Sequence, residues 1–335
     1  MNIMLTSAAY LFAAIAVGVM GFAIQRGATC TVAAVEEVVS RRRFGRLASM
    51  VEASLWVVGG LLIARTLNLL GPMPAGYVVS YLTVLGAALL GLGAYVNRAC
   101  VFGAIARLGS GEWAYVVTPV GFYAGCLAAE HVFPGMSGKL DHDSPVLQAS
   151  SWIALAFGCL MLWRFVALLV KGAPDAPGAP WWRRWGGRIA ARVWSPHVAT
   201  TVIGITFFFA LLLVGAWAYT DVLAELARGM TSSLLARGLL LVALFVGALI
   251  GGWTAGRFRS TPVSGSQLLK CFVGGMLMGW GSLLIPGGND GLILLGMPLL
   301  WPYAWLAFAT MCVVIGIALL AEKSLVRPAA KSGIG

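Results

Sequence analysis

The chain has 335 residues, of which 60% are hydrophobic and 10% are charged. An average soluble domain is about 45–50% apolar and about 25% charged. The apolar residues also form runs of about 18 or more, the length that crosses a bilayer as a helix. The composition therefore excludes an ordinary soluble domain. It predicts an all-α polytopic membrane protein, since a β-barrel would show short alternating segments instead.

In chain order, about nine membrane-spanning helices are expected, and three of them are followed by an interruption. The spans cover residues 5–24, 47–69, 78–96, 113–129, 152–170, 198–219, 234–256, 265–285 and 303–321. Short apolar pieces follow the interruptions, at residues 29–40, 99–108 and 292–300. Residues 171–196 form a basic linker between two membrane halves, 1–170 and 197–335. The composition of this linker is typical of an amphipathic segment on the membrane surface.

The net charge of +11 comes from Lys and Arg that cluster between the spans. Such residues stay in the cytoplasm, so the charge indicates topology and not nucleic-acid binding. Nine spans place the basic segments 41–46, 183–192 and 257–259 and the C-terminal tail in the cytoplasm, and the N-terminus outside. The less basic loops 71–76, 130–148 and 221–228 then lie outside. No cleavable signal peptide is expected, because the N-terminus has no basic stretch.

Three stretches combine glycines with polar residues after an apolar run. They are GFAIQRGATCT at residues 21–31, GLGAYVNRACVFG at residues 91–103, and GGMLMGWGSLLIPGGNDG ending at Gly291. Irregular backbone at membrane depth is tolerated only where it is buried in protein or lines a polar cavity. A short helix that begins at such a break points its positive N-terminal end at the cavity, which favours an anion. The breaks therefore predict a path for an anion.

Polar side chains precede the first two short pieces: Gln25 and Arg26, then Asn97 and Arg98. One interpretation is that they line the path and that the two arginines guide the anion. The alternative is that the arginines extend to the lipid headgroups or pair with acidic side chains. The acidic candidates are Glu36, Glu37 and Glu52.

Cys30 and Cys100 occupy the same place relative to the first two breaks. A thiol is polarisable and donates a weak hydrogen bond, so it is suited to a soft sulfur anion; the alternative is that both are small hydrophobic residues. The other cysteines are interpreted as core residues: Cys126, Cys159, Cys271 and Cys312. No CxxC spacing occurs, and His131, His142 and His197 lie in loops or at span ends, where they are expected to be solvated. We therefore expect no disulfide, metal site or cofactor.

The third break contains Gly288, Asn289 and Asp290. Both polar residues are good helix caps, and both are also candidates to line the path. Asp290 would oppose an anion unless it is protonated or paired, so capping is favoured for it. Cys100 lies seven positions after Gly93, and Gly288 lies seven positions after Gly281. Matching breaks in two halves are typical of a transporter with its site at the repeat interface, although helix-packing glycines also produce such a match.

These stretches resemble the YeeE/YedE family of sulfur transporters, and the resemblance covers nearly the whole chain. It implies a bacterial inner-membrane protein with an hourglass-like helical fold, short buried helices, and uptake of thiosulfate or a related compound. It also implies that Cys30 and Cys100 receive the thiosulfate sulfur in turn through S–H···S contacts. Family members commonly show Gly-Gly-Cys in the third stretch, where this chain has Gly287-Gly288-Asn289. The third thiol is absent, and Asn289 offers an amide donor to an oxyanion instead.

The expected function is therefore a permease for thiosulfate or a similar small sulfur anion. The alternative is a membrane sulfur-sensing or sulfur-relay component that hands a sulfur species or a signal to a cytoplasmic partner at residues 183–192. Any sulfur-carrier protein would be a separate chain. No nucleotide-binding loop, triad spacing or acid/base pair indicates an enzyme. No chain of intramembrane carboxylates is evident beyond Glu36, Glu37 and Glu52, so passive passage and proton coupling both stay open.

Overall fold

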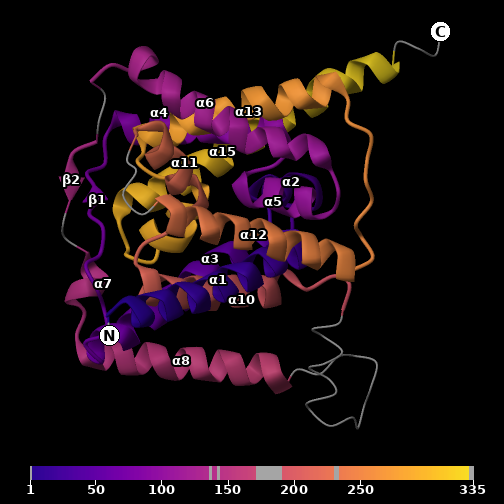
Figure 1. Cartoon of the computed structure of the whole chain (residues 1–335). Coiled ribbons are helices and arrows are strands. Elements are labelled where there is room, and N and C mark those ends of the chain that lie inside the picture. The colour runs from indigo at the N-terminus through magenta and orange to yellow at the C-terminus, as the bar shows by residue number, and fades with distance from the viewer. Residues whose placement is uncertain (1, 136–137, 142–143, 171–190, 230–233, 332–335) are drawn as a thin grey trace.

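The computed structural model describes residues 2–135, 138–141, 144–170, 191–229 and 234–331 as a bundle of helices (Figure 1). Seven helical stretches in these residues are long and apolar enough to cross a membrane. Two shorter apolar helices, Trp113–Ala129 and Ser151–Ala167, account for the other two predicted spans. The prediction of an all-α polytopic membrane fold is confirmed.

Each half of the bundle consists of the same unit twice: a long helix, a break, a short helix and a second long helix. The first half contains α1 (Asn2–Gly27), α2 (Thr31–Arg41), α3 (Gly45–Thr66), α4 (Tyr81–Asn97), α5 (Val101–Gly109), the 3₁₀ helix η1 (Trp113–Val116) and α6 (Val117–Val132). The second half contains α10 (Pro196–Val214), α11 (Tyr219–Ala227), α12 (Leu234–Thr254), α13 (Gly265–Leu284), α14 (Asn289–Gly291), the π-helical turn η2 (Leu292–Gly296) and α15 (Pro302–Lys331).

Four further elements of the described chain stand outside the repeated units. β1 (Gly76–Tyr77) lies between α3 and α4, while β2 (Leu140–Asp141), α7 (Pro145–Gln148) and α8 (Ser151–Val170) lie between the two halves in sequence. β1 and β2 form an antiparallel pair that joins the loop after α3 to the loop after α6. α8 lies at the margin of the bundle, where it packs on α3 (Figure 1).

The two halves pack against each other in a reciprocal way. α1 packs against α12 and α10 against α3, while α13 packs against α6 and α4 against α15. α1 also contacts α10, and α4 contacts α13, across the centre. Exchanging the two halves reproduces this set of contacts. The fold therefore contains the two pseudo-repeated halves that the matched breaks predict.

Small residues allow these helices to approach closely. In a bilayer, helices associate through van der Waals packing, and glycine lets two backbones come together. A Cβ added to Gly21 of α1 would overlap the carbonyl oxygen of Leu244, and one added to Gly247 of α12 would overlap that of Gly18. A Cβ on Gly93 of α4 would lie 2.6 Å from the carbonyl oxygen of Gly274. These glycines are helix-packing contacts, as the sequence predicts.

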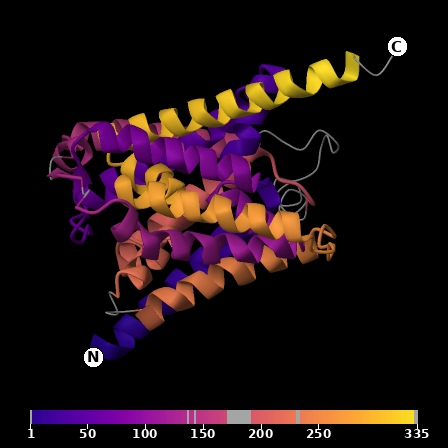
Figure 2. The same cartoon turned by 90° about the horizontal axis from the view of Figure 1, so that it is seen from above.

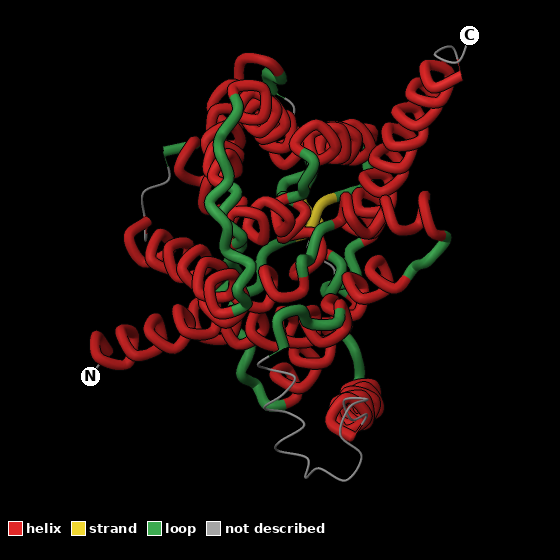
Figure 3. The backbone as a smooth tube through the Cα atoms, turned by 90° about the vertical axis from the view of Figure 1, so that its right-hand side faces the viewer, coloured by secondary structure: helices red, strands yellow, loops and turns green. Residues whose placement is uncertain are grey.

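The basic loops gather at one end of the bundle. The backbone N–H of Arg259 donates to the carbonyl oxygen of Ser110 at 2.9 Å, and Lys323 Nζ donates to Ser40 Oγ at 2.7 Å. Figure 3 shows the bundle with this end towards the viewer. β1, β2 and α7 lie at the opposite end, on the left of Figure 1. The view from above shows that α1 begins and α15 ends on opposite sides (Figure 2).

The prediction for the sixth span is wrong at its end. The expected helix over residues 198–219 stops at Val214, because Gly215 has a φ of 83° and interrupts it. The short helix α11 begins after this fourth break. Most of the basic linker (residues 171–190), predicted to be amphipathic, and His142 lie outside the described residues.

Replacing Gly247 tests the close approach of α1 and α12. We expect Gly247→Leu to lower the free energy of unfolding by at least about 2 kcal/mol, because the added side chain overlaps the backbone of α1. The thermal unfolding midpoint in detergent, followed by fluorescence, measures the change. Gly238→Leu is the matched control on the same helix, because a Cβ there meets nothing within 4 Å. Equal midpoints for the two variants would contradict the packing argument.

Candidate functional site

Four short helices begin in the interior of the bundle, one after each break. Their N-cap residues are Cys30, Cys100, Ala218 and Gly288, and all four have an extended backbone. α2 contacts α5, α5 contacts α14, and α14 contacts α11, so the short helices follow one another through the centre. Cys100 and Gly288, matched in sequence by their distance from a glycine, are therefore also matched in structure.

The first amides of a helix have no partner within that helix, and here side chains of a neighbouring short helix supply one. The backbone N–H of Thr31, at the start of α2, donates to Cys100 Sγ at 3.1 Å. The backbone N–H of Val101, at the start of α5, donates to Asn289 Oδ1 at 3.3 Å. Cys100 and Asn289 are thereby held together at the start of α5.

The second half repeats this arrangement with a carboxylate. The backbone N–H of Thr220 donates to Asp290 Oδ2 at 3.1 Å, and its hydroxyl donates to Asp290 Oδ1. Asp290 thus caps α11, whereas the sequence favoured a cap on its own short helix. The neighbouring Gly288 has no room for a side chain, because a Cβ there would overlap the Thr220 hydroxyl.

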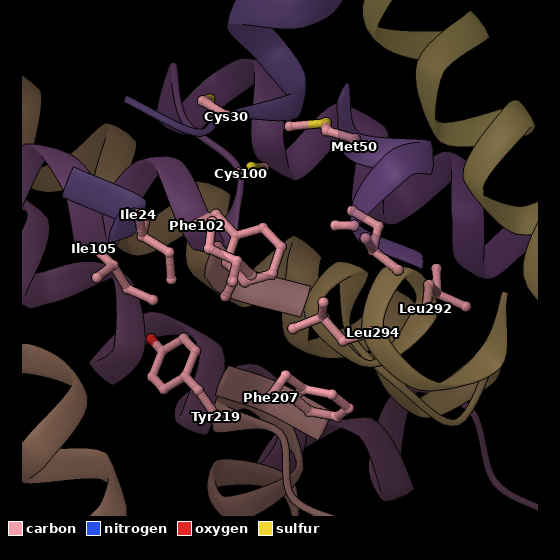
Figure 4. Close-up of a cluster of buried hydrophobic side chains, with 14 of the residues drawn as sticks. Ile24, Cys30, Met50, Cys100, Phe102, Ile105, Phe207, Tyr219, Leu292 and Leu294 are labelled. Atoms are coloured by element: carbon pink, nitrogen blue, oxygen red, sulfur yellow. The ribbon is translucent and has the colours of Figure 1, made fainter. Parts of the chain in front are cut away.

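Three sulfur atoms lie around the start of α2. Cys30 and Cys100 lie near each other, since the backbone N–H of Thr31, the residue after Cys30, donates to Cys100 Sγ. The Thr31 hydroxyl donates to Met50 Sδ at 3.7 Å, which brings the thioether beside them (Figure 4). Gly103 makes room for this cluster, since a Cβ there would lie 2.5 Å from Cys30 Sγ. The site is polarisable, and the backbone amide of Thr31 points into it.

A cavity of about 180 Å³ leads from the basic end of the bundle to Cys30. We call it the basic vestibule. Its charged lining residues are Arg46, Arg98, Arg107, Arg257, Glu36 and Glu112. Its lining contains four arginines and two glutamates, so it presents guanidinium groups, which favour an anion.

Three of these arginines form ion pairs at the rim of the basic vestibule, among them Arg46, whose Nε lies 3.9 Å from Glu37 Oε2. Arg98 pairs with Glu322 of α15, and the hydroxyl of Tyr95 also donates to Glu322 at 3.0 Å. Arg107 pairs with Glu112 at 3.0 Å. These pairs are partly exposed, so they contribute little to stability. The effect of these ion pairs is to hold the guanidinium groups in place beside the cavity.

A second cavity, of about 300 Å³, opens at the opposite end of the bundle, beside β1 and α11. We call it the aromatic vestibule, after Tyr77, Trp301 and Tyr303 in its lining. Tyr303 stacks on Trp301 and meets Tyr77 edge to face, with ring centroids 5.9 and 5.6 Å apart. Its charged lining residues are Asp221, Glu225, Arg228 and Arg237. Thr220 and Gly287 bring it to the starts of α11 and α14.

The row of short helices closes the space between the two vestibules. Cys100 and Asn289 are both completely buried, with 0% of their surface exposed. Asn289 Nδ2 has no hydrogen-bond partner among the described residues, although Oδ1 of the same amide is occupied by Val101. A buried amide donor without a partner is rare in proteins. Asn289 therefore holds a free buried donor at the start of α14.

Gln25 and Arg26 have different surroundings. Gln25 lines the basic vestibule, where Nε2 donates to Ser110 Oγ at 3.3 Å and Oε1 has no partner among the described residues. Arg26 is buried and lines neither vestibule. Its guanidinium donates to the carbonyl oxygen of Ala191 at 2.6 Å and to Thr254 Oγ1 at 2.8 Å. The structure therefore shows Arg26 joining α1 to α12 and to the chain before α10.

Asn97 and Arg98 also differ from each other: the side chain of Asn97 stabilises the break, and that of Arg98 lines a cavity. Asn97 Nδ2 donates to the carbonyl oxygen of Ala99 at 2.8 Å, and Asn97 Oδ1 accepts from the hydroxyl of Thr118 at 3.0 Å. Both ends of its amide thus hold the break in shape. Arg98 has a φ of 58°, which turns the chain out of α4, and its side chain lines the basic vestibule.

The acidic partners differ from those considered for the arginines. Arg98 pairs with Glu322, while Glu52 on α3 accepts from Arg164 of α8 at 2.9 Å and contacts His197 of α10. His197, which the sequence predicts to be solvated, has a side chain that is 39% exposed and that also contacts Glu52. Glu52, Arg164 and His197 join three helices.

Several residues of the site carry no signal in the sequence. Met50 and Glu322 lie inside long apolar helices, and Thr220 follows a break that the hydropathy pattern hides. The aromatic vestibule depends on Tyr77 and Trp301, which lie far apart in sequence. The close pair of Gly76 and Trp301, where a Cβ would lie 2.6 Å from the ring, is visible only in three dimensions.

Comparison with known protein families gives one match that covers most of the chain. A family described as sulphur transport matches residues 26–319. The matched region includes all four breaks and, apart from Gln25, every residue that lines the two vestibules. No curated protein is similar enough to this chain to be matched.

Thiol modification tests the placement of Cys30 in the basic vestibule. In single-cysteine variants that retain either Cys30 or Cys271, we expect a small anionic methanethiosulfonate to modify Cys30 at least about tenfold faster, because reaction requires access to the thiol. Cys271 is the control because it is buried and lines neither vestibule. Mass spectrometry of the reconstituted protein measures the rates. Equal rates at the two positions would show that the vestibule does not reach Cys30.

Proposed function

Because the chain belongs to the sulphur transport family, we propose that it is a bacterial inner-membrane permease for thiosulfate or a related small sulfur anion. The observation that carries the proposal is the position of the Cys100 thiol. It lies where α2 and α5 begin, accepts from the amide next to Cys30, and is enclosed between cavities from opposite ends of the bundle. Sulfur chemistry and the anion-favouring helix starts coincide at this point.

The two vestibules define a route for the anion. We assign the basic end to the cytoplasm, because Lys and Arg are retained there, and the aromatic vestibule and the N-terminus to the outside. Arg228 in the aromatic vestibule forms no ion pair with any described residue, so its charge is available to an arriving anion. The guanidinium groups of the basic vestibule then attract the anion beyond the constriction.

At the constriction, the thiols suit the terminal sulfur of thiosulfate. A neutral S–H group donates a weak hydrogen bond to a soft, charged sulfur, which allows contact without the tight binding that would stop transport. Cys100 makes this contact first and Cys30 next, because Cys30 lines the basic vestibule. Sulfate has no terminal sulfur, so it lacks the group that the thiols recognise.

Asn289 supplies the other half of the recognition. Its Oδ1 is fixed by the backbone of Val101, so the orientation of the amide leaves Nδ2 as the free donor. An amide N–H is a good partner for a sulfonate oxygen. Asn289 therefore replaces the thiol common in the family with a group that recognises the oxygen end of the anion. Beyond the basic vestibule, a separate cytoplasmic sulfur-carrier protein is the proposed receiver.

Removal of the Cys100 thiol tests the proposed function. We expect Cys100→Ala to reduce uptake of ³⁵S-labelled thiosulfate into proteoliposomes by about tenfold or more, since a hydrogen bond to a charged group contributes about 1.5–3 kcal/mol. Cys30→Ala is expected to have a smaller effect. Cys126→Ala is the matched control, because its thiol contacts the carbonyl oxygen of Gly279 inside the bundle.

Wild-type uptake in both Cys100→Ala and Cys30→Ala would reject a role for the thiols. Sulfate uptake as fast as thiosulfate uptake would reject recognition of the terminal sulfur. Thiosulfate binding with no uptake by the wild-type protein would favour the sensing alternative over the permease.

Two variants of Asn289 separate its two hydrogen-bonding groups. Asn289→Asp keeps an oxygen acceptor for the Val101 amide but replaces the donor with a negative charge. We expect it to fold and to reduce thiosulfate uptake by about tenfold or more, because a buried donor becomes a like charge. Asn289→Ala removes both groups and is expected to reduce both uptake and the unfolding midpoint. Full uptake by Asn289→Asp would contradict the role given to Nδ2.

A further inference from the structure

The aromatic vestibule contains a carboxyl group that the proposed route does not use. Asp221 lies in the first turn of α11 and lines this cavity. Its two oxygens both face the start of α14, since each would lie 3.9 Å from a Cβ placed on Gly291. Asp221 makes no hydrogen bond or ion pair with another described residue.

The surroundings of Asp221 oppose a negative charge. Asp290, next to Gly291, is deeply buried, and both of its oxygens accept hydrogen bonds from Thr220. Glu225, one turn along α11, is paired with Arg237 of α12, so that arginine already has a partner. A half-buried carboxyl next to like charges, without its own cation, binds a proton more readily.

Charged and titratable groups on the elements packed around Asp221 determine how readily it binds a proton. The titratable and charged groups facing Asp221 are Glu225 and Arg228 from α11, Asp290 from α14, Arg237 from α12, Tyr303 from α15 and Tyr77 from β1. α6 contributes His131 to a neighbouring cavity that shares Arg228. Burial, followed by the charges of Asp290 and Glu225, raises the pKa of the Asp221 carboxyl to about 7, and Arg237 limits this rise.

We propose that Asp221 is a proton-binding site at the mouth of the anion path, and that the sulfur anion enters the aromatic vestibule only when Asp221 is protonated. The proposal rests on the permease function and adds a linkage to protons. An ionised Asp221 would repel an anion and also neutralise Arg228 across the same cavity. Protonation removes one negative charge and leaves Arg228 free to attract the anion. Ionisable residues at membrane depth commonly serve as proton sites of this kind.

The sign of the pH dependence follows from which form of Asp221, protonated or ionised, admits the anion. Below pH 7 Asp221 is mostly protonated and admits the anion; above pH 7 it is mostly ionised and repels it. Between external pH 6 and 8, the protonated fraction of a group with this pKa falls about tenfold. Uptake of thiosulfate by wild-type proteoliposomes, with the internal pH held constant, is therefore expected to fall about tenfold over this range.

Two variants move this profile in different ways. Asp221→Asn keeps the size of the protonated carboxyl and cannot ionise, so its uptake is expected to be independent of pH and close to the wild-type rate at pH 6. Arg237→Gln removes the cation that lowers the pKa of Asp221, so the midpoint of the profile is expected to move to higher pH. Asp141→Asn, a carboxyl of β2 that lines neither vestibule, is the control and is expected to keep the wild-type profile.

Wild-type uptake that does not change between pH 6 and 8 would overturn the proton site. An Asp221→Asn variant that retains the wild-type pH profile would overturn the assignment to this residue. The thermal unfolding midpoint shows whether Asp221→Asn is folded. If it is not, the pH profile of Arg237→Gln decides: a pH midpoint that stays in place or moves to lower pH overturns the assignment. If the wild type takes up no thiosulfate at any pH, the proposed function fails, and the proton linkage fails with it.

Discussion

The constraint on which this structure depends is that a peptide group inside a membrane must have a hydrogen-bond partner. Each of the four breaks exposes the first amides of a short helix in the interior, where water cannot pair them. The protein solves this by having short helices cap one another: Cys100 accepts from Thr31, and Asn289 accepts from Val101. The groups that complete the backbone are therefore the same groups that stand between the two vestibules.

Much of this arrangement follows from local sequence. Long apolar runs define the spans, because only a helix pairs its own backbone over the thickness of a bilayer. Glycines followed by polar residues mark the breaks before α2, α5 and α14. The equal distance from Gly93 to Cys100 and from Gly281 to Gly288 identifies matched positions, and the structure shows both as N-caps. Such signals are readable because each lies within a few residues of the feature that it predicts.

The rest depends on contacts that no local pattern contains. Asn289 and Val101 are separated by 188 positions, and Arg98 and Glu322 by 224. The break before α11 is hidden because Trp217 and Tyr219 keep the segment apolar. In the sequence, an arginine beside a break looks the same whether its side chain lines a cavity, as that of Arg98 does, or holds helices together. Only the packing of the two halves separates these cases.

In both halves a side chain caps the start of a neighbouring short helix, but the acceptor group differs. This difference gives the two halves different roles. In the second half a carboxylate, Asp290, holds the start of α11 through two hydrogen bonds from Thr220. Carboxylate acceptors form strong bonds, so this end of the row is fixed. In the first half a thiol, Cys100, accepts from Thr31, and sulfur is a weak acceptor. An anion at Cys100 can therefore compete for the Thr31 amide at small cost. The pseudo-repeat thus combines a rigid support with an exchangeable contact, and the exchangeable contact is the one that contains sulfur.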